Sequence, residues 1–107
     1  MDVVNRFEVY WVNLDPTQGS EIQKTRPCVI VSPDELNHNL RTVITAPLTS
    51  TSKPYPTRIQ CTVDGREGWI VLDQLRTVDK ERLGRKIASL DDPTSEQILA
   101  IFQEMFS

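Results

Sequence analysis

The chain has 107 residues, of which 38% are hydrophobic and 25% charged, and its formal net charge is −3. This length suits a single domain, residues 1–107, with one hydrophobic core, and the composition excludes collagen-like, coiled-coil and disordered proteins. The apolar runs are far shorter than the ~20 residues of a membrane span, and charged residues near the start disfavour a signal peptide. We therefore expect no membrane association and a cytoplasmic location.

Strand-forming residues occupy positions 9–14, and a polar loop over residues 15–26 leads to an apolar strand over residues 27–31. Ser32, followed by Pro33 and two acids, predicts a short helix with Ser32 as its N-cap. Further strands are predicted over residues 42–48, 57–63, 68–72 and 85–90 and near Thr77, with a turn at 64–65 and one helical turn over 79–83.

A last helix is predicted to begin at Asp92-Pro93. Its apolar residues recur at helical spacing and form one stripe, which we expect to contact the core or a second copy of the chain: Ile98, Ile101, Phe102, Met105 and Phe106. Five to seven short strands with few helices favour a small closed or half-open β-barrel.

The usual hydrolytic, metal and nucleotide-binding motifs are absent from the sequence. Cys28 and Cys61 lie in apolar segments without CxxC spacing, so we expect buried, reduced thiols. His38, the single histidine, is expected on the surface and without a zinc cluster. The acids are scattered, with no D-x-D or H-x-E spacing and no phosphate-binding loop, so we expect neither a metal nor a cofactor.

Two polar loops remain as candidates for a functional site. One ends in Lys24-Thr25-Arg26-Pro27 and the other runs from Thr49 to Lys53. Residues 24–66 carry +3, although both flanks are acidic. A guanidinium with nearby hydroxyls suits a phosphodiester. RNA is the favoured substrate because its own 2′-OH is a nucleophile, so the protein need supply only geometry, charge stabilisation and help with proton transfer.

Simpler interpretations exist for the same residues. Arg26 could form an ion pair with Glu21 or Asp73, and residues 49–53 could be a solvated loop. Trp11 and Trp69 lie in predicted strands and are expected in the core, whereas a loop residue, Tyr55, is the better candidate for stacking on a single-stranded base.

Motifs follow one another along most of the chain: YWVNLDPTQGSE at residues 10–21, KTRP at 24–27, VIVSP at 29–33, PLTS at 47–50, and DQLRTVD at 73–79. With Tyr55-Pro56, they resemble the MazF/PemK toxins of bacterial toxin–antitoxin systems. The likeness extends from Arg6 to the C-terminal helix.

The resemblance implies a mainly β (α+β) fold, an SH3-like barrel with a short helix after the second strand and a C-terminal helix, and a homodimer. It implies a metal-independent, sequence-specific endoribonuclease that cuts single-stranded mRNA and so inhibits translation and growth. Attack by the 2′-OH leaves a 2′,3′-cyclic phosphate and a 5′-OH end. A MazE-like antitoxin would cover the RNA groove with an acidic C-terminal segment, and operator DNA would be bound only together with that antitoxin.

The resemblance also implies roles for individual residues. Arg26 would stabilise the pentacoordinate phosphate and move a proton, and Thr49 would hold a phosphate oxygen. The candidate RNA-binding and specificity residues are Ser20, Glu21, Lys24, Thr25, Ser50, Lys53, Tyr55, Asp73, Gln74 and Arg76.

The sequence departs from the family pattern at some positions. Phe7 stands where many members have a glycine before the first strand, and Ser20 and Val71 replace a histidine and an arginine of some plasmid-borne members, whose proposed catalytic set is not carried over. An alternative function is a non-enzymatic, gyrase-binding poison of the CcdB type, which acts through C-terminal aromatic residues; here Phe106 is expected to belong to the apolar stripe. A third possibility is a degenerate scaffold that only binds an antitoxin.

Overall fold

The computed structural model describes residues 3–15, 19 and 24–107. Over these residues the strands are β1 (Glu8–Asn13), β2 (Thr25–Ile30), β3 (Thr42–Thr49), β4 (Arg58–Val63), β5 (Arg66–Val71), β6 (Arg76–Asp79) and β7 (Leu83–Ser89). The helices are α1 (Asp34–Asn37) and α2 (Asp92–Met105), with 3-10 turns η1 (Leu72–Gln74) and η2 (Lys80–Arg82). Every predicted strand and helix is present, with its ends shifted by a few residues.

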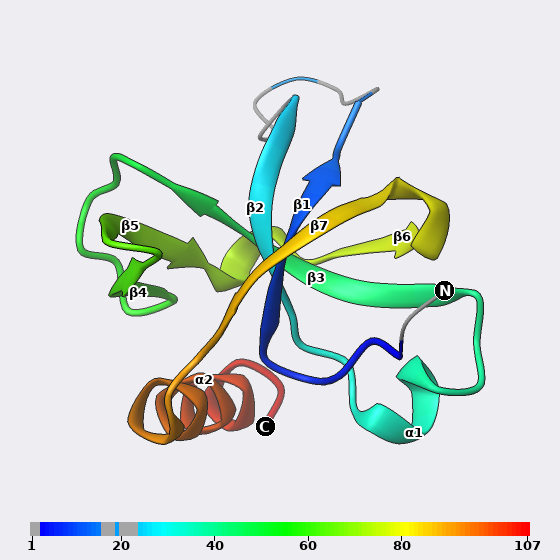
Figure 1. Cartoon of the computed structure of the whole chain (residues 1–107). Helices are drawn as coiled ribbons and strands as arrows, with labels where there is room; N and C mark the ends of the chain where they lie inside the picture. Colours follow the sequence, from blue (N-terminus) through cyan, green and yellow to red (C-terminus); the bar gives the residue numbers. More distant parts are fainter. Residues whose placement is uncertain (1–2, 16–18, 20–23) are drawn as a thin grey trace.

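All strand pairs are antiparallel, and the strand order is β4-β5-β3-β2-β1-β7, with β6 pairing separately with β3. β3 therefore has three partners along its length. The sheet curls so that β7 crosses in front of β1, and α2 packs at the end where β7 leaves the sheet (Figure 1). The mainly β, half-barrel architecture with a C-terminal helix is confirmed.

The core consists of two apolar clusters on either side of the curled sheet. Val9 and Val29 belong to the cluster that also contains Ile98 of α2, whereas Tyr10 and Cys28 belong to the other. Successive residues of a strand point to opposite faces, so a strand that is covered on both faces must be apolar throughout. This explains the continuous apolar runs in β1 and β2.

The predicted N-cap of the first helix is wrong. Pro33 occupies the N-cap position of α1, and no side chain caps the helix there. The buried Ser32 instead donates its hydroxyl to Asn37 Oδ1 and accepts the amide of Ile44 at 3.0 Å. Ser32 thus links α1 to β3, and these bonds satisfy the buried polar side chains of Ser32 and Asn37.

The apolar stripe of α2 is confirmed only in part. Ile98 is fully buried and Phe102 and Met105 pack against the core, but Phe106 is 70% exposed because the helix ends one residue before it. Trp11 and Trp69 are half-buried, so the expectation that both lie in the core was also wrong.

Phe7 adopts the left-handed backbone conformation, with φ of 68°. Its amide donates to Ile30 at 2.7 Å and its carbonyl accepts from Leu90 at 2.9 Å, so the ends of β2 and β7 hold it there. A glycine would adopt this conformation without strain, whereas a bulky residue such as Phe7 rarely does.

Both cysteines are free, as expected, but only Cys28 is buried, whereas Cys61 is half-buried. Burial raises the pKa of Cys28 to about 12 and that of Cys61 to about 11. Such thiols remain protonated near neutral pH and are poor nucleophiles. His38 is exposed, with Nε2 2.9 Å from Asn5 Oδ1. In the described ranges, neither helix has the length and apolar content that a membrane crossing requires.

A buried carboxylate joins the start of β1 to β7. Glu8 accepts the Asn5 amide at 2.6 Å and the Tyr10 hydroxyl at 3.0 Å, and its other oxygen lies 2.7 Å from Lys86 Nζ. Burial raises the pKa of Glu8, but the Lys86 ammonium and these two donors outweigh it, so the pKa lies below its ordinary value. Glu8 is therefore ionised and fully hydrogen-bonded at neutral pH.

We expect Glu8→Gln to lower the free energy of unfolding at pH 7 by about 1.5–3 kcal/mol, the usual contribution of hydrogen bonds to a charged group. The stabilisation is complete above the unfolded-state pKa of about 4.3 and is lost as the pH falls through the lower folded-state pKa. Urea unfolding of the natural chain and of Glu8→Gln at pH 7 and pH 3 measures the difference in their free energies of unfolding. This difference should be smaller at pH 3. A difference that stays constant contradicts this account of Glu8.

Candidate functional site

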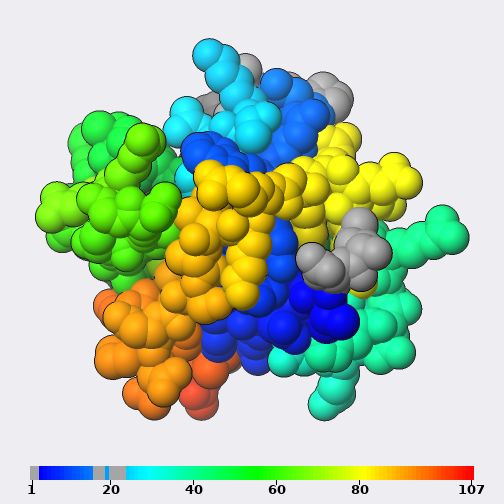
Figure 2. Space-filling view, viewed as in Figure 1, coloured from blue at the N-terminus to red at the C-terminus, as the bar shows by residue number. Residues whose placement is uncertain are grey.

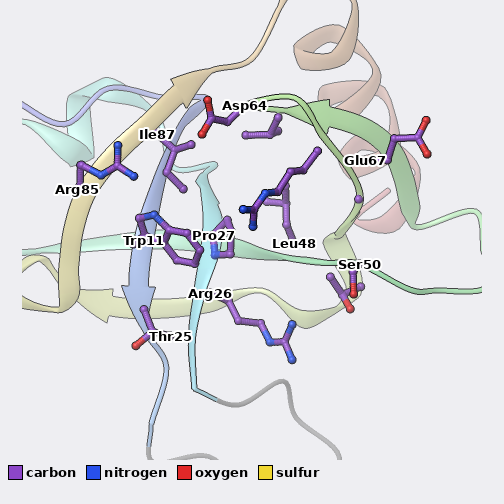
Figure 3. A pocket seen from close by; sticks show the side chains of 14 residues that line it. Trp11, Thr25, Arg26, Pro27, Leu48, Ser50, Asp64, Glu67, Arg85 and Ile87 are labelled. Atoms are coloured by element: carbon purple, nitrogen blue, oxygen red, sulfur yellow. The ribbon is translucent and has the colours of Figure 1, made fainter.

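An open pocket of about 350 Å³ contains both residues of the predicted catalytic pair, Arg26 and Thr49. Its walls come from β1, β2, β7, the end of β3 and the β4–β5 hairpin (Figure 3). In Figure 2 the segment from the end of β3 through β5 forms a lobe beside β7. Thr25 and Ser50 line the pocket too, so the last residues of the first polar loop and the start of the second meet at one site.

Strand pairing places Arg26 at the pocket. Arg26 lies opposite Val12 of β1, and the neighbouring pair is Trp11 with Pro27. Trp11 and Pro27 lie at the centre of the pocket, and the guanidinium of Arg26 extends beyond them on the side where Ser50 lies (Figure 3). Arg26 is half-buried, so its stem packs on protein while its charged group reaches the opening.

Thr49 is held by the last pair of the β3–β5 ladder, in which it lies opposite Trp69. A Cβ on Gly68 would lie 3.2 Å from the carbonyl oxygen of Thr49, so the absence of a side chain lets β5 approach closely. The Thr49 hydroxyl donates to the carbonyl of Thr51 at 3.2 Å. A rotation about χ1 would let the same hydroxyl exchange this carbonyl acceptor for a phosphate oxygen.

The pocket has an apolar floor and a charged rim. Besides Trp11 and Pro27, the floor includes Leu48 and Ile87. Three arginines and two acids line the rim, namely Arg26, Arg66, Arg85, Asp64 and Glu67. In Figure 3 the carboxylate of Glu67 points away from the centre of the pocket. The net charge of these side chains is +1, which favours an anionic ligand.

Sequence reasoning missed most of the far wall of this pocket. Arg66 appeared only as one of several bases in the +3 segment, and Arg85 was not singled out. The turn at Asp64-Gly65 was a usable signal. Both residues have positive φ, 52° and 76°, as a tight two-residue hairpin requires. This turn brings Arg66 back over the pocket, but only the curl of the sheet decides that β7 faces it.

Several predicted RNA-binding residues do not line the pocket. Lys24 is exposed at the base of the first loop, where its amide donates to Asp15 at 2.9 Å. Arg76 donates to the carbonyl of Leu14. Lys53 and Gln74 also lie outside the pocket lining. Ser20 and Glu21 fall outside the described residues, so the proposed ion pair of Arg26 with Glu21 does as well.

Asp73 and Tyr55, also predicted to contact RNA, both lie against Arg58. The Asp73 carboxylate accepts Arg58 Nε and Nη2, each at 3.1 Å, and the Thr57 hydroxyl at 3.0 Å. The Arg58 hydrogen bonds lower the pKa of Asp73, and Asp73 in turn raises the pKa of Arg58. Asp73 is thus the partner of Arg58, whereas the simpler interpretation of Arg26 had offered Asp73 as one of its two possible partners.

Over residues 3–15, 19 and 24–107, no group of three or more His, Cys, Asp or Glu side chains is arranged to hold a metal ion. The acidic residues that line the pocket are Asp64 and Glu67.

Comparison with known proteins places the chain in a family. Residues 5–106 match the family model described as PemK-like, MazF-like toxin of type II toxin–antitoxin system. A curated relative, Endoribonuclease EndoA of Bacillus subtilis, is 33% identical over 102 residues, which cover 90% of this chain and 88% of the relative.

Solved structures share the fold at lower identity. MazF from Deinococcus radiodurans superposes with a TM-score of 0.87 at 22% identity, covering 98% of this chain and 97% of that one. The Mycobacterium tuberculosis toxin MazF-mt6 gives 0.78 at 20% identity, over 92% and 95%. The family match covers nearly the whole chain, and the structural matches agree with it. The chain belongs to the PemK-like, MazF-like family of toxins of type II toxin–antitoxin systems.

Proposed function

We propose that this chain is the toxin of a type II toxin–antitoxin pair and acts as an endoribonuclease on single-stranded RNA, without a metal ion. The observation that supports it most directly is the shared pocket of Arg26, Thr49 and Ser50, which combines a guanidinium with two hydroxyls. The relative EndoA carries the name endoribonuclease and is similar over nearly its whole length.

The proposed reaction uses the substrate as its own nucleophile. The ribose 2′-oxygen attacks the adjacent phosphorus as it loses its proton, and the bond to the 5′-oxygen breaks as that oxygen gains a proton. The products are a 2′,3′-cyclic phosphate and a 5′-OH end. Arg26 neutralises the charge on the pentacoordinate phosphorus, and the Thr49 hydroxyl donates to one of its oxygens. Donors held in place before the reaction stabilise such a transition state most effectively.

The charged rim also suits the proposed partners. Arg66 and Arg85 face the same opening as Arg26, so an RNA backbone or an acidic antitoxin segment would meet positive charge there. Neighbouring folds include a mycobacterial endoribonuclease in complex with its cognate antitoxin and a MazE-MazF complex of Deinococcus radiodurans. We propose an antitoxin partner with an acidic C-terminal segment over this pocket, a homodimeric toxin, and binding of operator DNA only together with the antitoxin.

The gyrase-binding alternative depends on an accessible aromatic residue near the C-terminus. Phe106 was expected to be buried with the apolar stripe, which would have disfavoured this alternative. Because Phe106 is 70% exposed, that objection does not hold. Phe106 does contact Phe102, with ring centroids 6.2 Å apart. The two functions differ in their dependence on Arg26, which lies in the pocket and not near the C-terminal helix.

Arg26→Ala should abolish both RNA cleavage and growth arrest, with a fall in kcat of about 100- to 1,000-fold or more, the usual cost of losing one oxyanion donor. Arg26→Lys should also lose most activity because an ammonium cannot present two forked donors. The kcat of each variant is measured by cleavage of a long RNA without stable structure, with mapping of the new 5′ ends.

The exposed Arg41 lies outside the pocket, so Arg41→Ala is the matched control. Growth arrest that survives Arg26→Ala favours the gyrase alternative.

Two substitutions of Thr49 distinguish the contribution of its hydroxyl from that of its side-chain volume. Thr49→Val keeps the volume and should lower kcat by about 10- to 100-fold, because a transition-state hydrogen bond is lost. Thr49→Ser retains the hydroxyl and should stay within a few-fold of the natural protein. Single-turnover cleavage by the two variants gives the comparison, and equal rates for both would refute a role for the hydroxyl.

Cleavage should be unchanged in excess EDTA, because the mechanism assigns charge stabilisation to Arg26 rather than to an ion. The measurement is the initial rate on the same RNA before and after chelation. Loss of activity in EDTA, with recovery on addition of Mg²⁺, would contradict the metal-independent mechanism.

A further inference from the structure

We propose that Arg58 is a positioning residue for the RNA cleavage proposed above: it fixes the loop between β3 and β4, residues 50–57, so that Tyr55 offers one ring face to an RNA base. This inference rests on the proposed function and adds a specificity device to it. No part of it depends on the catalytic pair itself.

Arg58 is the first residue of β4 and uses three of its nitrogens on the protein. Nε and Nη2 each donate to Asp73 at 3.1 Å, and Nη1 donates to Ser52 Oγ at 2.9 Å. The Thr57 hydroxyl donates to the same carboxylate at 3.0 Å. One guanidinium therefore connects the loop, the start of β4 and η1.

The same guanidinium lies over the ring of Tyr55, with the carbon Cζ 4.8 Å from the ring centroid. The Arg58 amide also donates to the Tyr55 carbonyl at 3.0 Å, so both the backbone and the ring of Tyr55 are held by one residue. Tyr55 nevertheless remains 48% exposed. A guanidinium on one side of an exposed aromatic ring leaves the other side for stacking on a base.

The loop held in this way begins at the pocket. Thr49 ends β3 and lines the pocket, Ser50 follows it there, and Ser52 is tied to Arg58. A base stacked on Tyr55 would thus lie on RNA that also reaches the pocket. An immobilised ring loses little conformational entropy when the base binds, which is the advantage that Arg58 provides.

Lysine cannot replace this arrangement, because a point charge cannot donate to Asp73 through two parallel bonds, to Ser52, and cover a ring at the same time. Arg58→Lys keeps the charge and isolates the geometry. Tyr55→Ala removes the stacking ring at an exposed position, and Tyr55→Phe is its matched control because the ring remains.

The test is steady-state cleavage of a long unstructured RNA by the full chain, with mapped 5′ ends. Arg58→Lys and Tyr55→Ala should each raise KM about tenfold, the effect expected of one base–aromatic stack, and broaden the set of cut sites, while kcat changes less than about threefold. Tyr55→Phe should match the natural protein. The double variant should be no worse than either single one, because the two residues act as a unit.

An unchanged KM in Arg58→Lys or in Tyr55→Ala overturns the proposal, as does a fall in kcat with KM unchanged or fully additive effects in the double variant. If thermal unfolding shows that Arg58→Lys does not fold, Tyr55→Ala and Tyr55→Phe decide the matter alone. A natural chain that cleaves no RNA overturns the proposed function, and with it this inference. Cleavage with a normal KM in the variants overturns the inference alone.

Discussion

The site depends on one strand, β3, that pairs with three others. Its first half pairs with β6, its middle with β2, and its last two residues with β5. The β2 pairing aligns Cys28 with Pro47, so Arg26 and Thr49 lie close to the same end of neighbouring strands. The β5 pairing then brings the β4–β5 hairpin over that end. Any register shift in β3 would separate the cation from the hydroxyl, because a one-residue slip reverses the faces of a strand.

The backbone pairing of the strands contrasts with the way the loop side chains are held. Arg26 and Thr49 are placed by backbone ladders, whereas the side chain of Arg58 contributes several of the contacts that hold the loop after β3. Backbone ladders tolerate many side-chain changes, but a guanidinium that makes several contacts at once does not. In the proposed ribonuclease, the residues on the strands would therefore carry out the cleavage, and the loop after β3 would select the base.

Stability and binding also use different charged groups. Glu8 and Lys86 join β1 to β7 away from the pocket, with Glu8 almost fully buried. Arg66 and Arg85 are exposed on the pocket rim. A buried, hydrogen-bonded carboxylate contributes to folding, whereas exposed arginines contribute little to stability and remain available for an anion. The acidic total charge is therefore compatible with a locally basic opening.

The sequence alone determined the order of strands and helices, because alternation, apolar runs and turn residues are local signals. Ordered motifs such as KTRP and PLTS identified the family and supplied Arg26 and Thr49 as the candidate catalytic pair. Only the tertiary structure decided that Asp73 pairs with Arg58, that Phe106 is exposed, and that Arg85 faces the pocket. These facts depend on contacts between residues far apart in the chain. The curl of the sheet sets such contacts, and no local pattern encodes it.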